Sequence, residues 1–175
     1  MTDTATRPVA MIRPYRPVDH AACRRLWVEL TETRRRLYDD PTIGGRDPGA
    51  AFEDYLTRLD LSGMWVGDHP EEGVVGFVGL ILDGRAGEVD PVIVAQAWRG
   101  LGVGRALLGR VADEARKRGM RSLSVSPAAR NTDAIHSLHD AGYTALSHVT
   151  LTLDLSPQGH EWIDGIELHS QRFKF

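Results

Sequence analysis

One glycine-rich stretch constrains the fold more than any other part of the chain. A β-branched run ends at Val94, a short turn follows, and three alternating glycines, Gly100, Gly102 and Gly104, open a helical pattern. The first four backbone amides of a helix have no partner within the helix, and glycines leave those amides accessible. Because the helix dipole adds positive potential at this end, the stretch predicts a site for a phosphate or pyrophosphate.

Two common phosphate-binding loops do not fit this stretch. A Walker A loop requires Gly-Lys followed by Ser or Thr, but Gly104 is followed by Arg105-Ala106, so no hydroxyl is available for magnesium. The dinucleotide fingerprint requires a small residue three positions after its second glycine, where this chain has Arg105 or Leu107. The pattern that remains is Arg/Gln-x-x-Gly-x-Gly, which residues 99–104 fill.

Periodicity and turn residues predict a chain of alternating helices and strands. Strands are expected over Met11–Arg16, Met64–Gly67, Val74–Leu82, Ala86–Val94 and Arg121–Ser126, with one or two more within Thr144–Leu155, and helices over His20–Tyr38, Ala50–Leu59, Val103–Arg118 and Asn131–Ala141. We expect Asp19 to cap the first helix, because an Asp side chain at this position accepts from exposed amides. Pro91 cannot donate a ladder hydrogen bond, so it predicts a β-bulge or a place where neighbouring strands part.

A second motif lies in residues 131–143. Asn131, Ala134, Gly142 and Tyr143 fit the pattern Asn-x-x-Ala-x-x-x-Tyr-x-x-x-Gly-Phe/Tyr, in which Leu138 takes the tyrosine position. Together with the glycine loop and the order of elements, this motif resembles the GNAT family of N-acetyltransferases. The resemblance implies the acyl-CoA N-acyltransferase fold, of the α/β (α+β) class. This fold has a mixed, largely antiparallel central sheet with a splayed parallel strand pair, flanked by helices.

The resemblance covers most of the chain and predicts its organisation. We expect a loose N-terminal tail over residues 1–10 and an acetyltransferase domain over residues 11–155. Residues 156–175 are expected to form a C-terminal tail that packs on the domain or on a partner subunit. The apolar residues Trp162, Phe173 and Phe175 support this packing, since a free tail is usually polar.

The resemblance also implies that acetyl-coenzyme A is the co-substrate. Its pyrophosphate would bind the loop amides, and its pantetheine arm would lie along the end of the preceding strand. The expected cofactor-binding residues are Val92, Ile93, Val94, Arg99, Gly100, Leu101, Gly102, Val103, Gly104, Arg105 and Asn131. The Val94 amide would polarise the thioester carbonyl. No metal is expected, because His136 and His139 lack metal-ligand spacing.

Glu88 and Asp90 are the candidate general bases. They stand two residues apart, so they share one face of their strand unless the bulge at Pro91 intervenes. The resemblance places an acid near the start of this strand, which favours Glu88 first and Asp90 second. The alternative for each is a solvated strand residue. Because Leu138 replaces the tyrosine that commonly protonates the leaving thiolate, the general acid stays open.

The expected function is transfer of an acetyl group from acetyl-coenzyme A to a primary amine of a small molecule or peptide, by direct attack on the thioester. One alternative is a non-catalytic acyl-CoA-binding or regulatory module of the same fold, which Leu138 favours. Another is a nucleotide-binding domain unrelated to coenzyme A. For the acceptor, Trp27, Tyr38, Asp39 and Asp40 form a candidate aromatic and acidic site.

Composition limits the partners. The chain has 175 residues, which suits one domain, and a net charge of −3 without a sustained basic face argues against nucleic-acid binding. No apolar run approaches the length of a membrane span, and Met1–Arg7 does not read as a secretory signal, so we expect a cytoplasmic protein. The sequence is compatible with a homodimer.

Overall fold

The computed structural model describes residues 10–60, 63–155, 157 and 159–175. The chain forms two compact units, Met1–Ser126 and Pro127–Phe175. Apart from Ala10, the expected N-terminal tail lies outside the described residues.

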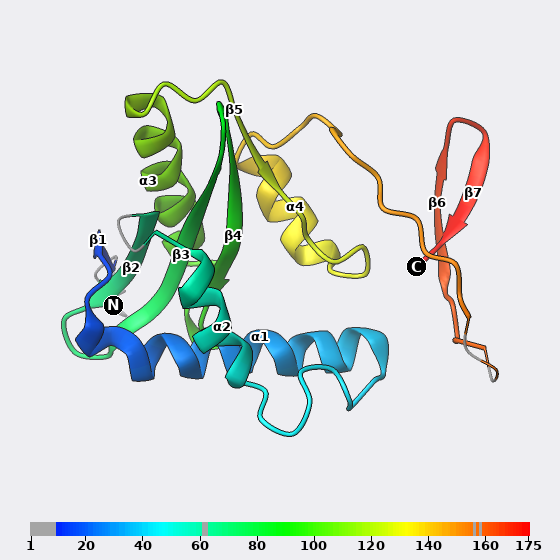
Figure 1. The fold of residues 1–175 in the computed structure, drawn as a ribbon, viewed down its shortest axis with the longest axis horizontal. Helices are drawn as coiled ribbons and strands as arrows, with labels where there is room; N and C mark the ends of the chain where they lie inside the picture. The colour runs from blue at the N-terminus through cyan, green and yellow to red at the C-terminus, as the bar shows by residue number, and fades with distance from the viewer. Residues whose placement is uncertain (1–9, 61–62, 156, 158) are drawn as a thin grey trace, which may run out of the picture. The chain divides into compact units, whose positions relative to one another are not determined.

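The first unit is a five-stranded sheet with helices on both faces (Figure 1). Its elements are β1 (Met11–Pro14), α1 (His20–Tyr38), α2 (Ala50–Arg58), β2 (Met64–His69), β3 (Gly73–Asp83), β4 (Ala86–Val94), α3 (Val103–Lys117) and β5 (Ser122–Val125), with 3₁₀ turns η1 (Pro17–Asp19) and η3 (Gln96–Trp98). The strand order is β1-β2-β3-β4-β5, antiparallel except for the parallel β4–β5 pair. The predicted mixed, largely antiparallel sheet is therefore confirmed, with element ends within two residues of expectation.

The helices divide between the two faces of the sheet, as the alternation along β3 shows. The Phe77 ring lies beside Trp27 of α1 and Phe52 of α2, with centroids 6.5 and 5.8 Å away. A Cβ on the neighbouring Gly76 would instead lie 3.2 Å from Leu107 of α3. Because successive strand residues point to opposite faces, α1 and α2 cover one face and α3 covers the other.

The predicted bulge is present in β4. Val78 pairs with Val92 and Leu80 pairs with Val89, so β4 has one more residue than β3 in this interval. Asp90 and Pro91, which are joined by a cis peptide bond, therefore oppose Gly79. The parallel pairing of β4 with β5 covers only residues 86–89, because β5 ends at Val125 opposite Val89. Beyond the bulge, β4 continues without β5, which confirms the expected parting of these strands.

The start of α1 differs from the expectation in one respect. Asp19 occupies the N-cap position, but its side chain accepts no capping hydrogen bond from the helix. Instead, its carboxylate binds the Arg13 guanidinium at 2.7 and 2.8 Å and accepts from the Arg16 amide at 2.8 Å. The prediction of a side-chain cap was wrong, because a charged partner from β1 outcompetes the helix amides for this carboxylate.

The second unit contains α4 (Thr132–Asp140) and a hairpin of β6 (Asp164–Leu168) and β7 (Gln171–Lys174). Asn131 caps α4 by accepting from the Ala134 amide at 3.2 Å. The predicted strands within Thr144–Leu155 were wrong, because these residues form no strand. Leu151 and Leu153 are 66% and 81% exposed. Alternation makes a segment compatible with a strand, but a strand also requires a hydrogen-bonded neighbour.

Candidate active site

The glycine loop leaves the start of α3 accessible. Gly100 and Gly102 have φ angles of +73° and +88°, the left-handed region that favours glycine. A Cβ on either residue would meet no atom within 4 Å. Gly102 is the N-cap of α3, and no side chain caps the helix there. The first-turn amides of this 15-residue helix are therefore available to an anion.

The third glycine and its neighbour have a packing role. A Cβ on Gly104 would make an ordinary contact, 3.6 Å from Val94 Cγ2, so this residue faces β4. The Val103 side chain is buried and lies against Gly67 and Gly76 of the sheet. Through these contacts α3 begins directly against the strands, and Val103 can bind a cofactor only through its backbone.

Trp98 supports the loop from within the protein. It is 6% exposed, and its ring centroid lies 4.5 Å from that of His69 at the end of β2. His69 Nδ1 accepts from the amides of Glu71 and Glu72, each at 3.3 Å, which orients the imidazole. The turn before the glycines is thus packed against the β2–β3 connection.

The two arginines beside the loop differ. Arg99 donates from Nε to the carbonyl oxygen of Val94 at 3.0 Å. Leu101 and Arg105 are both exposed in the loop and at the start of α3. Arg99 therefore stabilises the connection between strand and loop, whereas Arg105 presents its charge to solvent.

The end of β4 offers backbone groups along an open edge. Ala95 donates its amide to Val75 of β3 at 2.9 Å. Successive residues of a strand direct their backbone groups to alternate edges, so the amides of Val94 and Val92 face away from β3. Within the first unit, β5 does not reach Val92 and Val94, because it ends at Val125, opposite Val89. The side chain of Ile93, between them, is buried in the core cluster.

Glu88 and Asp90 lie on the face that α1 and α2 cover. Glu88 pairs with Ile81, whose side chain packs against the core cluster on that face. Burial raises the pKa of the Tyr55 hydroxyl in α2, and Asp90 lies close enough for its charge to raise it further. Asp90 is the first of the two bulge residues that oppose Gly79, and its proximity to Tyr55 places it on the same face as Glu88.

Glu29 of α1 is a residue that the sequence analysis missed. Its carboxylate accepts from the Gln96 amide at 3.2 Å, in the turn directly after β4. The two residues are 67 positions apart, and the only signal in the sequence is a carboxylate next to the apolar stripe of α1. This contact joins α1 to the strand end that carries Val94.

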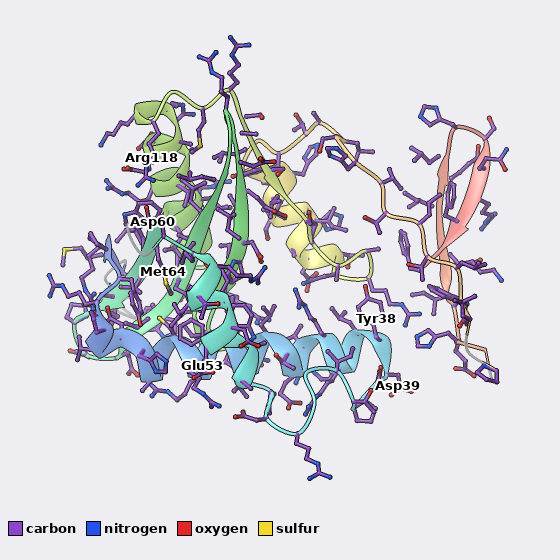
Figure 2. All side chains as sticks on the ribbon, viewed as in Figure 1. Tyr38, Asp39, Glu53, Asp60, Met64 and Arg118 are labelled. Atoms are coloured by element: carbon purple, nitrogen blue, oxygen red, sulfur yellow. The ribbon has the colours of Figure 1, made fainter. Side chains whose placement is uncertain are left out.

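The proposed aromatic and acidic acceptor site is not formed. Trp27 is buried in the core, with its ring centroid 5.0 Å from Tyr55. Tyr38 is the last residue of α1 and Asp39 follows it. Both lie away from the part of α1 that Glu53 of α2 approaches (Figure 2). Tyr38 lies eleven positions after Trp27 in the same helix, a rise of about 16 Å. The expectation was wrong because Trp27 belongs to the buried stripe of the helix.

The remaining candidates belong to the second unit. Asn131 uses its side-chain oxygen for the α4 cap, Leu138 is buried, and His136 and His139 are exposed. Contact of Asn131 with a cofactor stays a prediction. Among the residues that the structure describes, no three His, Cys, Asp or Glu side chains are grouped as metal ligands. None of the described helices combines the length and apolar character needed to span a membrane.

Comparison with known proteins identifies the family. The model of the acetyltransferase (GNAT) family matches residues 27–143. No curated protein matches the chain in sequence.

Solved structures agree on the fold. An acetyltransferase of the GNAT family from Staphylococcus aureus is 18% identical, with a TM-score of 0.62 over 82% of this chain and 93% of its own. A transcriptional regulator from Bacillus halodurans is 18% identical, with a TM-score of 0.61 over 83% of this chain and 99% of its own. Ribosomal-protein-alanine N-acetyltransferase from Brucella melitensis is 23% identical, with a TM-score of 0.58 over 75% and 83%. The chain therefore belongs to the GNAT family of acetyltransferases.

Proposed function

We propose that this protein transfers the acetyl group of acetyl-coenzyme A to a primary amine of a small molecule or peptide. One observation carries the proposal: within the first unit, the end of β4 pairs with β3 but not with β5, and a short turn joins it to the uncapped, glycine-rich start of α3. A strand edge and a helix start in sequence suit a ligand with an extended amide arm and a pyrophosphate.

The residues present fit acetyl-coenzyme A. The amides at residues 102–104 would hold the pyrophosphate. The space beside Gly100 and Gly102 is open, since a Cβ placed on either residue would meet no atom within 4 Å. The outward-facing backbone groups of Val92 would pair with the pantetheine amides, as a neighbouring strand would. When bound, the co-substrate supplies a thioester whose carbonyl is open to attack by an amine. We assign no metal to the reaction.

Val94 and the two carboxylates of β4 would perform the remaining tasks. The Val94 amide points from the open edge, where it would donate to the thioester carbonyl oxygen and stabilise developing negative charge. Glu88 or Asp90 would take a proton from the acceptor ammonium, directly or through water, because only a neutral amine is nucleophilic. Holding both reactants in place contributes much of the rate, on the order of 7–11 kcal/mol for well-oriented groups.

Proton delivery to the leaving thiolate completes the reaction. Leu138 stands where the family often has tyrosine, and it is buried in α4. His136 and His139 are exposed side chains of the same helix. We therefore keep these histidines and solvent as the candidate proton donors.

An assay of thiol release tests the proposal. The protein is incubated with acetyl-coenzyme A and a panel of primary amines that includes polyamines, amino acids and peptides with free N-termini. We expect amine-dependent release of free coenzyme A and an acceptor mass increased by one acetyl group. Tight binding of acetyl-coenzyme A without release for any amine would favour the non-catalytic binding module. Displacement of coenzyme A by ATP or NAD would favour the nucleotide-binding alternative.

A further inference from the structure

Tyr55 carries a buried hydroxyl that the mechanism above does not use. The side chain belongs to α2 and is 0% exposed, within the aromatic cluster of Trp27, Phe52 and Phe77. Its hydroxyl has no hydrogen-bond partner among the described residues. Buried hydroxyls are nearly always paired, so an unpaired one points to a partner that arrives by side-chain rotation or as a bound water.

The sheet makes room for this hydroxyl at the bulge. A Cβ on Gly79 would lie 1.7 Å from Tyr55 Oη and 2.6 Å from the carbonyl oxygen of Asp90. The hydroxyl thus occupies the space of a side chain at Gly79 and is a near neighbour of Asp90. Gly79 is the residue of β3 that opposes Asp90 and Pro91. The hydroxyl therefore points at the interruption of the β3–β4 ladder.

Tyr55 is suited to donate a hydrogen bond and not to ionise. Burial raises the pKa of its hydroxyl, and the nearby charge of Asp90 raises it further. Both effects favour the protonated hydroxyl, which can donate a hydrogen bond. A carboxylate accepts a hydrogen bond more strongly than a backbone carbonyl does, so the side chain of Asp90 is preferred over its carbonyl oxygen as the partner.

We propose that Tyr55 is a positioning residue for Asp90: its hydroxyl donates a hydrogen bond to the Asp90 carboxylate, directly or through one water, and holds it for proton transfer. This inference rests on the proposed function, because it assigns the positioned carboxylate to the acceptor amine. It distinguishes Asp90 from Glu88, which lies two residues before it on the same face. The alternative is a hydroxyl that fills space and has no role in the reaction.

Carboxyl-carbon NMR on protein labelled with ¹³C at aspartate tests the contact without any acceptor. The Asp90 resonance is assigned by its loss in D90N. We expect Tyr55→Phe to shift this resonance and to leave the other aspartates unchanged. Tyr15→Phe is the matched control, because Tyr15 is a partly buried tyrosine packed against the same core. An Asp90 resonance that does not move in Tyr55→Phe, or moves equally in Tyr15→Phe, overturns the inference.

Kinetics with an accepted amine separate positioning from packing. Loss of a hydrogen bond to a charged group predicts a kcat lowered roughly tenfold in Tyr55→Phe, with the KM for acetyl-coenzyme A unchanged. A space-filling hydroxyl predicts a higher Tm and unchanged kcat, since phenylalanine buries no unpaired group. Absence of turnover in the wild type contradicts the proposed function. An unmoved resonance contradicts the Tyr55–Asp90 hydrogen bond whether or not the protein turns over.

Discussion

Arg99 donates a hydrogen bond from Nε to the carbonyl oxygen of Val94 over 3.0 Å, and so joins the glycine loop to the end of β4. These two segments would bind different parts of acetyl-coenzyme A in the proposed site, the pyrophosphate and the pantetheine arm. Their relative position determines whether both can be bound at once. The contact also occupies the Val94 carbonyl, while the Val94 amide stays directed to the same open edge.

Replacing Arg99 should therefore weaken cofactor binding. We expect Arg99→Ala to raise the KM for acetyl-coenzyme A about three- to tenfold, the range for one lost hydrogen bond. Arg116→Ala is the control, because Arg116 lies in the last turn of α3 and pairs with Asp113 at 2.9 Å. Steady-state kinetics against acetyl-coenzyme A provide the measurement. Equal effects of the two substitutions would contradict a specific role for Arg99.

The loop glycines should respond differently to alanine. Gly102→Ala places a Cβ at a φ of +88°, so we expect a loss of about 1–2 kcal/mol in unfolding free energy. Gly104 lies within α3 and has room for a methyl group, so Gly104→Ala should be neutral or stabilising by up to about 1 kcal/mol. Chemical denaturation of both variants shows whether Gly102→Ala lowers the unfolding free energy more than Gly104→Ala does. Greater destabilisation by Gly104→Ala would refute this account of the loop.

One of the two carboxylates on β4 should be required for turnover. We expect Glu88→Gln or Asp90→Asn to lower kcat by about 10²- to 10⁴-fold, as for loss of a general base, with little change in the KM for acetyl-coenzyme A. Asp83→Asn is the control, because Asp83 is an exposed residue at the end of β3. If both Glu88→Gln and Asp90→Asn retain full kcat, neither carboxylate is the base.

The ion pair of Asp19 with Arg13 should make stability depend on acid pH. Hydrogen bonds from Arg13 hold the pKa of the Asp19 carboxyl below its ordinary value, although burial opposes this effect. A carboxyl whose pKa is lower in the folded state stabilises the fold at pH values above its unfolded pKa of about 4. This contribution to the unfolding free energy is lost as the pH falls below that value.

We expect Asp19→Asn to lower the free energy of unfolding by about 2 kcal/mol at pH 7 and by much less near pH 3. Urea denaturation at the two pH values provides the comparison. Asp113→Asn serves as the control, because its pair with Arg116 is exposed. A cost for Asp19→Asn that does not change with pH would exclude the ion pair as the cause.

Local patterns sufficed to predict most of the first unit. The apolar periodicity of α1 and the missing donor of Pro91 are properties of short segments, and each led to the observed element or bulge. Arg99 and the glycines were found for the same reason. Each prediction depended on backbone chemistry within a few residues.

Long-range pairing could not be predicted in this way. The alternating residues 150–153 have the pattern of a strand but no strand partner, and Asp19 binds an arginine of β1 in place of its own helix. Glu29 and Gln96 meet only because α1 packs across β4, and Tyr55 meets the bulge only because α2 packs on Gly79. In each case the decisive partner is distant in sequence.

The most direct test of the central claim is a crystal structure of the protein in complex with acetyl-coenzyme A. The account predicts the pyrophosphate within hydrogen-bond distance of the amides at residues 102–104, with the pantetheine arm along Val92 and Val94 and the acetyl carbonyl at the Val94 amide. A pyrophosphate bound away from the start of α3, or an arm that does not follow the open edge of β4, would contradict it.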